Sequence, residues 1–479
     1  MTSIESILRK NGPLISSELA KLLSKREKIT INTASQRVAR NAEISQIKGF
    51  FKSNQSLCFL PDHKNHNVLV ERLIDAMYES GRKYWYTVNA IKMNEGVIGR
   101  TYLECYTNYP IIPLKGHIPF DNVMEKFVSQ KILVSNNTDY QFSPDFSKMV
   151  TNPLLHRTIE LIKDNILSDF NTLARNIGLV SYNTGTIFGE FAKFRWGYKG
   201  VSPIMGLREK NKFGFLLADI ILGRPFYKQD VLFFIEKIKH VQSFKNASKL
   251  FPILLVDNLD TEALTFLKSK GIVVGFLKEL FGEKYATAIN ELITILNNAG
   301  ASLKADPDKY LDLIHELKKY NEGLANNIKG TLFEFVIGHF HRLKCQSLDI
   351  GREIISDIGR VDIDVLALYS DKTVFAECKA YKALVNEEIV DVWITKSIPA
   401  MRKWALGQDR LKDYLMEFEF WSISGFTEQA LKDLQVAKEK TKAYQIGFFG
   451  PNELRDTALK TKNKKLKEAI DNFFLKPTV

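Results

Sequence analysis

The stretch VDIDVLALYSDKTVFAECK, residues 361–379, decides the fold of the C-terminal third of the chain. Polar and apolar residues alternate in both of its halves, and a polar turn separates them. This pattern predicts two antiparallel strands joined in a hairpin. A turn at the central Ser-Asp step places Asp364 opposite Glu377, and Asp362 opposite Lys379. Because Cβ atoms of directly paired residues lie roughly 5 Å apart, two acids are predicted to face each other.

The two facing acids predict a divalent cation. Ionised carboxylates at this distance repel each other, and a bound cation removes that cost. Oxygen ligands that leave positions for water and phosphate favour Mg²⁺, or Mn²⁺, over zinc. Glu334 adds a third acid, since it lies in the apolar helical run 332–337, where a carboxylate is costly unless a partner compensates it. We therefore expect Glu334 beside the same cation.

These residues resemble the PD-(D/E)xK, or restriction-endonuclease-like, nuclease superfamily. The resemblance rests on a helix acid, an aspartate and an acid-x-lysine pattern in this order: Glu334, Asp364 and Glu377-Cys378-Lys379. Residues 420–430 and 444–450 resemble the closing strand, helix and strand of its Mrr-like branch. The resemblance covers residues 326 to about 455, and Ile363 stands where the family name has proline.

The resemblance implies metal-dependent hydrolysis of phosphodiester bonds. The metal ligands that it implies are Asp364, Glu377 and the Cys378 carbonyl, with Asp362 as an alternative to Asp364. Lys379 would orient or deprotonate the attacking water and offset charge on the phosphate, and Glu334 would hold metal-bound water. Lys396, on the following helix, is a further candidate phosphate contact. The alternative is an ordinary hairpin with solvated charges, in which Asp362 and Lys379 form a weak surface pair.

The N-terminal 62 residues predict a DNA-binding unit. They contain three helical segments and then two strands, at Ser3–Lys10, Ser16–Leu23, Asn32–Arg40, Ile44–Phe51 and Ser56–Leu60. This order is that of a winged helix-turn-helix, whose third helix and wing contact DNA. The candidate DNA contacts are Gln36, Arg37, Arg40, Lys48 and Lys52. Winged helices also serve as protein-binding modules, which is the alternative.

Residues 63–150 predict a second, winged-helix-like domain. Helical patterns cover Val68–Tyr78 and Met124–Gln130, and a hairpin with an Asn136-Asn137 turn closes the segment. The aromatic run Tyr84-Trp85-Tyr86 favours a place in the core over stacking on bases.

An internal repeat links two α/β segments, at residues 151–284 and 326–479, with a helical linker at 285–325. Gly185–Phe191 echoes Gly330–Phe335, and we expect a helix in both places. Each copy then shows strand, helix, strand, helix and strand patterns, although any two such segments can share this rhythm by chance.

The first copy is predicted to be degenerate. It carries Ala218-Asp219-Ile220 where the acid-x-lysine pattern would fall, and the spacing from Gly185 to Asp219 is shorter than that from Gly330 to Glu377. It could serve packing, dimerisation or DNA binding. The last role rests on a basic patch, although solvated surface charge explains these residues as well: Lys193, Arg195, Lys199, Arg208, Lys210 and Lys212.

Composition agrees with a polyanionic partner. The 479 residues include 67 Lys and Arg against 55 Asp and Glu, a formal net charge of +12. Four cysteines without close pairs argue against disulfides and a structural zinc site. We find no apolar span and no Gly-rich phosphate loop in the sequence, so we expect a cytoplasmic protein that needs neither a membrane nor a nucleotide cofactor.

The sequence thus predicts a multidomain α/β protein with an α+β N-terminal part. Its winged-helix units precede two restriction-endonuclease-like units, of which the first is degenerate. The expected function is Mg²⁺-dependent cleavage of double-stranded DNA in a restriction or anti-invader setting, where cutting both strands would favour a homodimer. Two alternatives remain: a DNA-binding regulator with a nuclease fold as scaffold, and an RNA or DNA nuclease that a partner activates.

Overall fold

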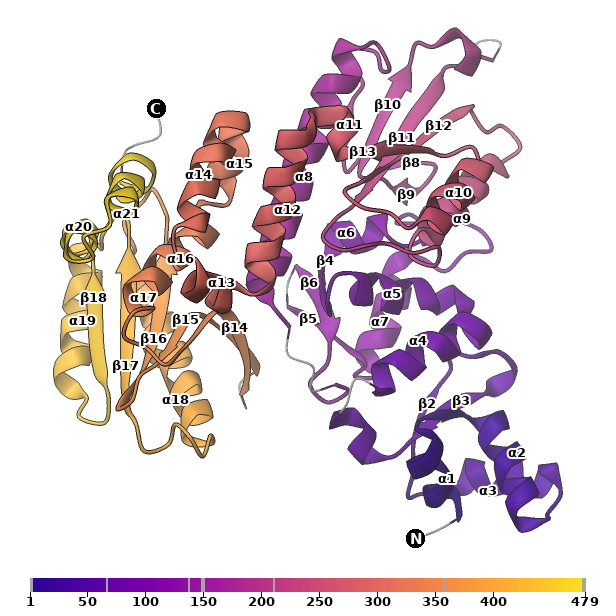
Figure 1. The fold of residues 1–479 in the computed structure, drawn as a ribbon. Coiled ribbons are helices and arrows are strands. Elements are labelled where there is room, and N and C mark those ends of the chain that lie inside the picture. Colours follow the sequence, from indigo (N-terminus) through magenta and orange to yellow (C-terminus); the bar gives the residue numbers. More distant parts are fainter. Residues whose placement is uncertain are drawn as a thin grey trace. The chain divides into compact units, whose positions relative to one another are not determined.

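The computed structural model describes residues 3–65, 68–136, 138–147, 151–209, 212–356 and 359–475. The chain forms a mixed α/β structure with several small sheets (Figure 1). It divides into two compact units. Unit 1 contains residues 1–149, 167–221 and 225–275, and unit 2 contains residues 150–166, 222–224 and 276–479. Within the described ranges, no helix combines the length and the apolar character that a bilayer crossing requires.

Unit 1 begins with three helices and a three-stranded antiparallel sheet. The helices are α1 (Ser3–Asn11), α2 (Ser16–Glu27) and α3 (Ile31–Arg40), and the strands are β1 (Leu14–Ile15), β2 (Ser45–Lys48) and β3 (Ser56–Phe59). The sheet order is β1-β3-β2. The predicted helices and hairpin are confirmed, although α3 begins at Ile31 because the Thr30 hydroxyl accepts the Thr33 N–H.

The next part of unit 1 repeats this order of elements, with one additional helix at its start. Its helices are α4 (Val68–Ser80), α5 (Arg82–Met93), α6 (Arg100–Cys105) and α7 (Phe120–Ser129), and its strands are β4 (Val97–Gly99), β5 (Leu133–Asn136) and β6 (Asp139–Phe142). The sheet order β4-β6-β5 matches that of the first sheet. Tyr84, Trp85 and Tyr86 are buried, which confirms the core interpretation and removes them as candidates for base stacking. The expected turn residue Asn137 lies outside the described residues.

The α/β part of unit 1 contains a five-stranded sheet with the order β13-β12-β11-β10-β7. Its strands are β7 (Thr186–Ile187), β10 (Tyr198–Ser202), β11 (Gly214–Ile221), β12 (Leu250–Val256) and β13 (Val273–Phe276). Strands β10 and β11 are antiparallel, whereas β11 and β12 are parallel. Helices α9 (Leu232–Gln242) and α10 (Thr261–Ser269) connect the later strands.

The helix expected after Gly185 does not form, so that prediction is wrong. The segment instead contains β7 and the small pair β8 (Glu190–Phe191) and β9 (Phe194–Arg195). Phe188, Ala192 and Lys193 have positive φ, which turns the chain and prevents a continuous helix. Gly330–Phe335, by contrast, lies in a helix, so the two similar sequences adopt different structures.

Unit 2 contains a second five-stranded sheet, with the order β14-β15-β16-β17-β18. Its strands are β14 (Ser347–Ser356), β15 (Gly359–Leu368), β16 (Lys372–Lys379), β17 (Leu415–Ser422) and β18 (Gln445–Phe449). An antiparallel pair, β15 and β16, is followed by the parallel strands β17 and β18. The arrangement matches that of β10, β11 and β12 in unit 1, so the strand pattern of the predicted repeat is present although its helical start is not.

The rest of unit 2 is mainly helical, and some of its helices pack on this sheet. The helices of the unit are α11 (Leu277–Phe281), α12 (Glu283–Asn297), α13 (Ala299–Ala305), α14 (Lys309–Tyr320), α15 (Glu322–Asn327), α16 (Lys329–His341), α17 (Glu387–Val392), α18 (Ile398–Leu406), α19 (Glu428–Lys440), α20 (Pro451–Lys460) and α21 (Lys464–Ala469), together with the first part of α8 (Pro153–Asn176). Phe375, Phe418 and Phe420 join a buried cluster with residues of α17, α18 and α19. Phe340 of α16 contacts Trp421, whose side chain points to the other face.

The hairpin of β15 and β16 has the predicted turn and register. Val365 lies opposite Ala376, and the pairing runs to Leu368 opposite Thr373. The ladder ends at Val365, the residue after Asp364, so the predicted pairing of Asp364 with Glu377 lies just beyond it and is not formed. The acids therefore lie where the two strands separate, at the carboxyl end of β16.

Candidate functional site

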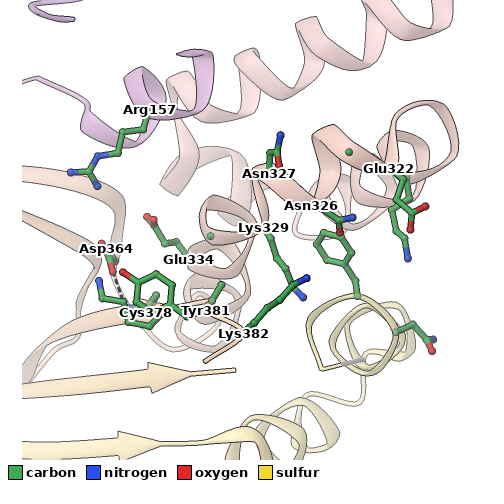
Figure 2. A pocket seen from close by; sticks show the side chains of 17 residues that line it. Arg157, Glu322, Asn326, Asn327, Lys329, Glu334, Asp364, Cys378, Tyr381 and Lys382 are labelled. Atoms are coloured by element: carbon green, nitrogen blue, oxygen red, sulfur yellow. Dashed lines mark hydrogen bonds between the residues drawn. The ribbon is translucent and has the colours of Figure 1, made fainter. Parts of the chain in front are cut away.

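Three elements bring two of the predicted acids and the predicted lysine to one pocket of about 1090 Å³, whose lining does not include Glu377. Helix α16 supplies Glu334, strand β15 supplies Asp364, and the end of β16 supplies Cys378 and Lys379 (Figure 2). Arg157, from the first part of α8, lies in the same wall. All of these residues belong to unit 2.

Asp364 is held by the backbone at the point where the hairpin ladder ends. Its Oδ2 accepts the Cys378 main-chain N–H at 2.7 Å. Burial, and then the neighbouring Glu377, raise the pKa of the Asp364 carboxyl to about 7, although Lys379 opposes this shift. The site therefore holds an acid whose ionised form is disfavoured until a cation approaches.

Glu377 and Lys379 form an ion pair with each other at the end of β16. Burial lowers the pKa of Lys379, but Glu377 and Asp364 raise it by more, so the net pKa lies above its usual range. The ammonium is thus firmly protonated. In this state Lys379 can offset negative charge and orient water, but it cannot accept a proton.

Glu334 is the least satisfied group of the site. Its Oε2 is buried and has no hydrogen-bond partner among the described residues. Burial, together with Asp364, raises the pKa of the Glu334 carboxyl well above its usual range. A buried carboxylate oxygen without a partner is costly, which indicates that something else compensates it when the site is complete.

Arg157 was missed by sequence reasoning, because it lies far from the hairpin and in an unremarkable amphipathic helix. Its Nη2 lies 2.5 Å from Asp362 Oδ2. Burial lowers the pKa of the Arg157 guanidinium, but Asp362 and Asp364 raise it above its usual value. Asp362 was expected to lie opposite Lys379. It pairs instead with Arg157 and lies opposite Glu353 of β14, because the β15–β16 ladder has already ended.

The donor set fits a hard divalent cation, although the side chains are not closed around one. Within the ranges that the structure describes, no three His, Cys, Asp or Glu side chains form a ready metal cluster. Glu334 nevertheless presents an unpartnered buried oxygen, and Asp364 is an acid that a cation would stabilise. Carboxylate oxygens of this kind are the ligands that Mg²⁺ and Mn²⁺ prefer. Glu377 is held by Lys379, and Cys378 contacts Asp364 through its N–H.

The other candidate residues lie away from this pocket. Lys396 is exposed on the π-helical turn Trp393–Ser397 and does not line it. In unit 1, Gln36, Arg37 and Arg40 line a separate pocket of about 530 Å³, to which α1 and α2 also contribute residues. Arg37 is paired with Glu27 at 2.5 Å.

The wing candidates are also exposed. Lys48 ends β2, and Lys52 lies in the short 3-10 turn Lys52–Asn54 between β2 and β3. Of the basic patch suggested in the first α/β segment, Lys210 lies outside the described residues. Arg195 is committed to a contact with Glu104 at 2.9 Å.

The corresponding acid of unit 1 has a different environment. Asp219 in β11 is fully buried and forms an ion pair of 2.6 Å with the equally buried Lys237 of α9. Its other oxygen accepts the Gly197 N–H at 2.7 Å. Lys237 also donates to the carbonyl oxygens of Cys105 and Arg195. A lysine thus occupies the place beside this acid where a cation would bind.

Comparisons with known proteins add no assignment. No protein-family model matches the sequence, and no curated protein matches it. A search of solved structures finds the crystal structure of protein VC1899 from Vibrio cholerae, at 11% sequence identity, covering 61% of this chain and 81% of that one. Its TM-score is 0.19, which is too low to support an inference about fold or function.

Proposed function

We propose that unit 2 is a Mg²⁺-dependent nuclease of the PD-(D/E)xK type. The observation that carries the proposal is the convergence of Glu334, Asp364 and Lys379 in one pocket, where Glu334 Oε2 has no partner among the described residues. A purely structural site would pair its buried acids, whereas a catalytic site keeps a carboxylate ready for a cation.

In this proposal each residue of the pocket has a distinct task. A bound Mg²⁺ supplies a Lewis acid and lowers the pKa of bound water. Asp364 and Glu334 are the acids that would hold it, with Glu377 as a third ligand once Lys379 turns towards substrate. The protonated Lys379 ammonium offsets charge that develops on the phosphate, and it positions the attacking water.

The two N-terminal parts of unit 1 are proposed to be winged helices that bind DNA. The first has the helix and strand order of that fold, and Gln36 and Arg40 are exposed on its third helix. The α/β part of unit 1 is proposed to be a degenerate nuclease unit, since the Asp219–Lys237 pair supplies internally the charge that a cation would supply.

Plasmid cleavage tests the catalytic proposal. Purified full-length protein is incubated with supercoiled methylated and unmethylated plasmid, and with RNA, in Mg²⁺ or in EDTA. We expect Mg²⁺-dependent nicking or linearisation, which Lys379→Ala and Asp364→Ala should each slow by roughly 10²–10³-fold. The control variant is Lys432→Ala, because Lys432 is exposed on α19 and does not line the pocket.

The pattern of results separates the alternatives. Intact DNA with salt-sensitive binding would refute catalysis by the free protein and favour a regulator or a partner-activated effector. Cleavage of RNA alone would keep the active site and change the substrate class. A restriction role predicts that methylation of the plasmid changes the rate.

A further inference from the structure

Three lysines gather in the nuclease pocket apart from the acids. They are Lys318 of α14, Lys329 at the first position of α16, and Lys382 after β16. Figure 2 shows the ends of Lys329 and Lys382 close to each other, while Glu334 points away from them, towards the side of Asp364 and Arg157. The three lysines and the two acids Glu334 and Asp364 therefore lie in different parts of the pocket. We call Lys318, Lys329 and Lys382 the lysine cluster.

The lysine cluster has no internal compensation. None of its members forms an ion pair with an acid of the described chain, although Glu322 lines the same pocket. Burial, and then Lys382 and Lys318, lower the pKa of the Lys329 ammonium. The ammonium groups of Lys318 and Lys329 both lie beside Phe473, at 5.6 and 5.5 Å from its ring centre. This shared aromatic contact limits how far the two charges can separate.

The surroundings of the cluster suit an anion with several oxygen atoms. Asn326, Asn327 and Asn472 bring amide groups that can donate hydrogen bonds to the same pocket. The first turn of α16 also faces it, and Gly330 leaves the approach open, since a Cβ at that position would meet no atom within 4 Å. Unpaired N–H groups at a helix start favour phosphate.

We propose that the lysine cluster binds a second phosphate of the polynucleotide whose scissile phosphate lies at Glu334 and Asp364. This inference rests on the proposed nuclease function, because it assigns the lysine cluster and the acids Glu334 and Asp364 to neighbouring phosphates of one polynucleotide. The ligand chemistry is a phosphate group. It comes either from an internal phosphodiester or from a terminal phosphomonoester, and the experiment distinguishes these sources.

Lysine acetylation of the full-length protein tests the proposal without relying on cleavage. Wild type in EDTA and Asp364→Asn in Mg²⁺ are treated with acetic anhydride, with or without a short oligonucleotide that carries a 5′-phosphate or a 5′-hydroxyl. Mass spectrometry then gives the extent of reaction at each lysine. Lys329 and Lys382 should be protected by the oligonucleotide, and the exposed Lys432 should not.

The two oligonucleotides identify the source of the phosphate. Protection by both indicates an internal phosphodiester, and protection by the 5′-phosphorylated strand alone indicates a terminal phosphate. Equal reaction of Lys329 and Lys382 with and without either strand would overturn the proposal.

A binding measurement provides the second test. Lys329→Gln/Lys382→Gln, built on Asp364→Asn, should bind DNA more weakly, and its slope of log K against log salt should become less negative by about 1 to 2. Lys432→Gln on the same background is the control. An unchanged slope would contradict the cluster. Protected lysines, together with intact DNA when wild type is assayed in Mg²⁺, would refute catalysis by the free protein and leave the phosphate site in place.

Discussion

At the scale of single residues, burial and the neighbouring Glu377 disfavour the charged form of Asp364. Its folded pKa of about 7 lies above the ordinary value of 3.8. Between these values the folded state holds a proton that the unfolded state releases. Folding stability therefore falls as pH rises through this window, and the loss is complete above pH 7.

The resulting prediction concerns Asp364→Asn, which removes the unfavourable charge. In EDTA at pH 8 this variant should be more stable than wild type by about 1–3 kcal/mol, and the gain should largely vanish near pH 4. Thermal unfolding at the two pH values measures the difference. Mg²⁺ should raise the Tm of wild type but not that of the variant, and a variant less stable than wild type at pH 8 would contradict this account of the site.

Arg157 places a fixed positive charge beside the acids. Its guanidinium is paired with Asp362 and also influences Asp364 and Glu334. Removing this charge makes the pocket more negative, so Arg157→Gln should bind Mg²⁺ about three- to tenfold more tightly. Titration calorimetry gives the affinity, and the exposed Arg410→Gln is the matched control. Unchanged Mg²⁺ affinity with a raised KM for DNA would instead make Arg157 a substrate contact.

At the scale of elements, the hairpin was predictable and its surroundings were not. Alternation and a turn suffice to set the register of β15 and β16, since the side-chain period of a strand is two residues. The same logic extended the pairing to Asp362, but the strands separate before that point, and a contact from α8 replaces it. The local sequence pattern of a strand does not predict which helix from a distant part of the chain will contact the end of that strand.

The failed helix after Gly185 shows the same limit in another form. Two similar short sequences adopt a strand in one place and a helix in the other. Residues at positive φ and the neighbouring β10 decide the first case. The strands β11, β12 and β13, which follow in the sequence, were predicted correctly. Buried strands appear in a sequence as continuous apolar runs, and such runs can be recognised without knowing the fold.

A buried polar network joins α16 to the sheet. The Trp421 indole N–H donates to Glu419 Oε2 at 2.6 Å, and His341 Nε2 lies 3.2 Å from the same oxygen. Burial raises the pKa of the Glu419 carboxyl, but His341 and Trp421 lower it by more, so the net pKa lies below its usual value. This acid therefore contributes stability above its unfolded pKa, and the contribution is lost as pH falls through its folded pKa.

Glu419→Gln should consequently destabilise the protein by about 1–3 kcal/mol at pH 7, because it leaves buried donors poorly paired. The difference from wild type should shrink only as the pH falls through the lowered folded pKa of Glu419, where the wild-type carboxyl also becomes protonated. Chemical denaturation across this pH range provides the measurement. A difference that stays constant with pH would show that packing, not the ionised carboxylate, is what the substitution disturbs.

At the scale of the whole molecule, the chain carries a formal net charge of +12. Composition predicted a polyanionic partner, but it did not show which basic residues are available. Arg37 forms an ion pair with Glu27, and Arg195 forms one with Glu104. Lys237 forms a buried ion pair with Asp219. Of the residues nominated at the start of the chain, Arg40 and Lys48 are exposed and form no ion pair with a described acid.

The last prediction follows from this availability. Arg40→Gln/Lys48→Gln should raise the KM for DNA cleavage about tenfold or more and make the salt dependence of binding shallower by about 2, since two phosphate contacts are removed. The cleavage rate at saturating DNA should stay unchanged, because neither residue belongs to the pocket of unit 2. Steady-state kinetics over a salt series measures both quantities, with Lys10→Gln, at an exposed position of α1, as the control. A fall in the saturated rate with KM intact would mean that the N-terminal part controls the active site instead of capturing DNA.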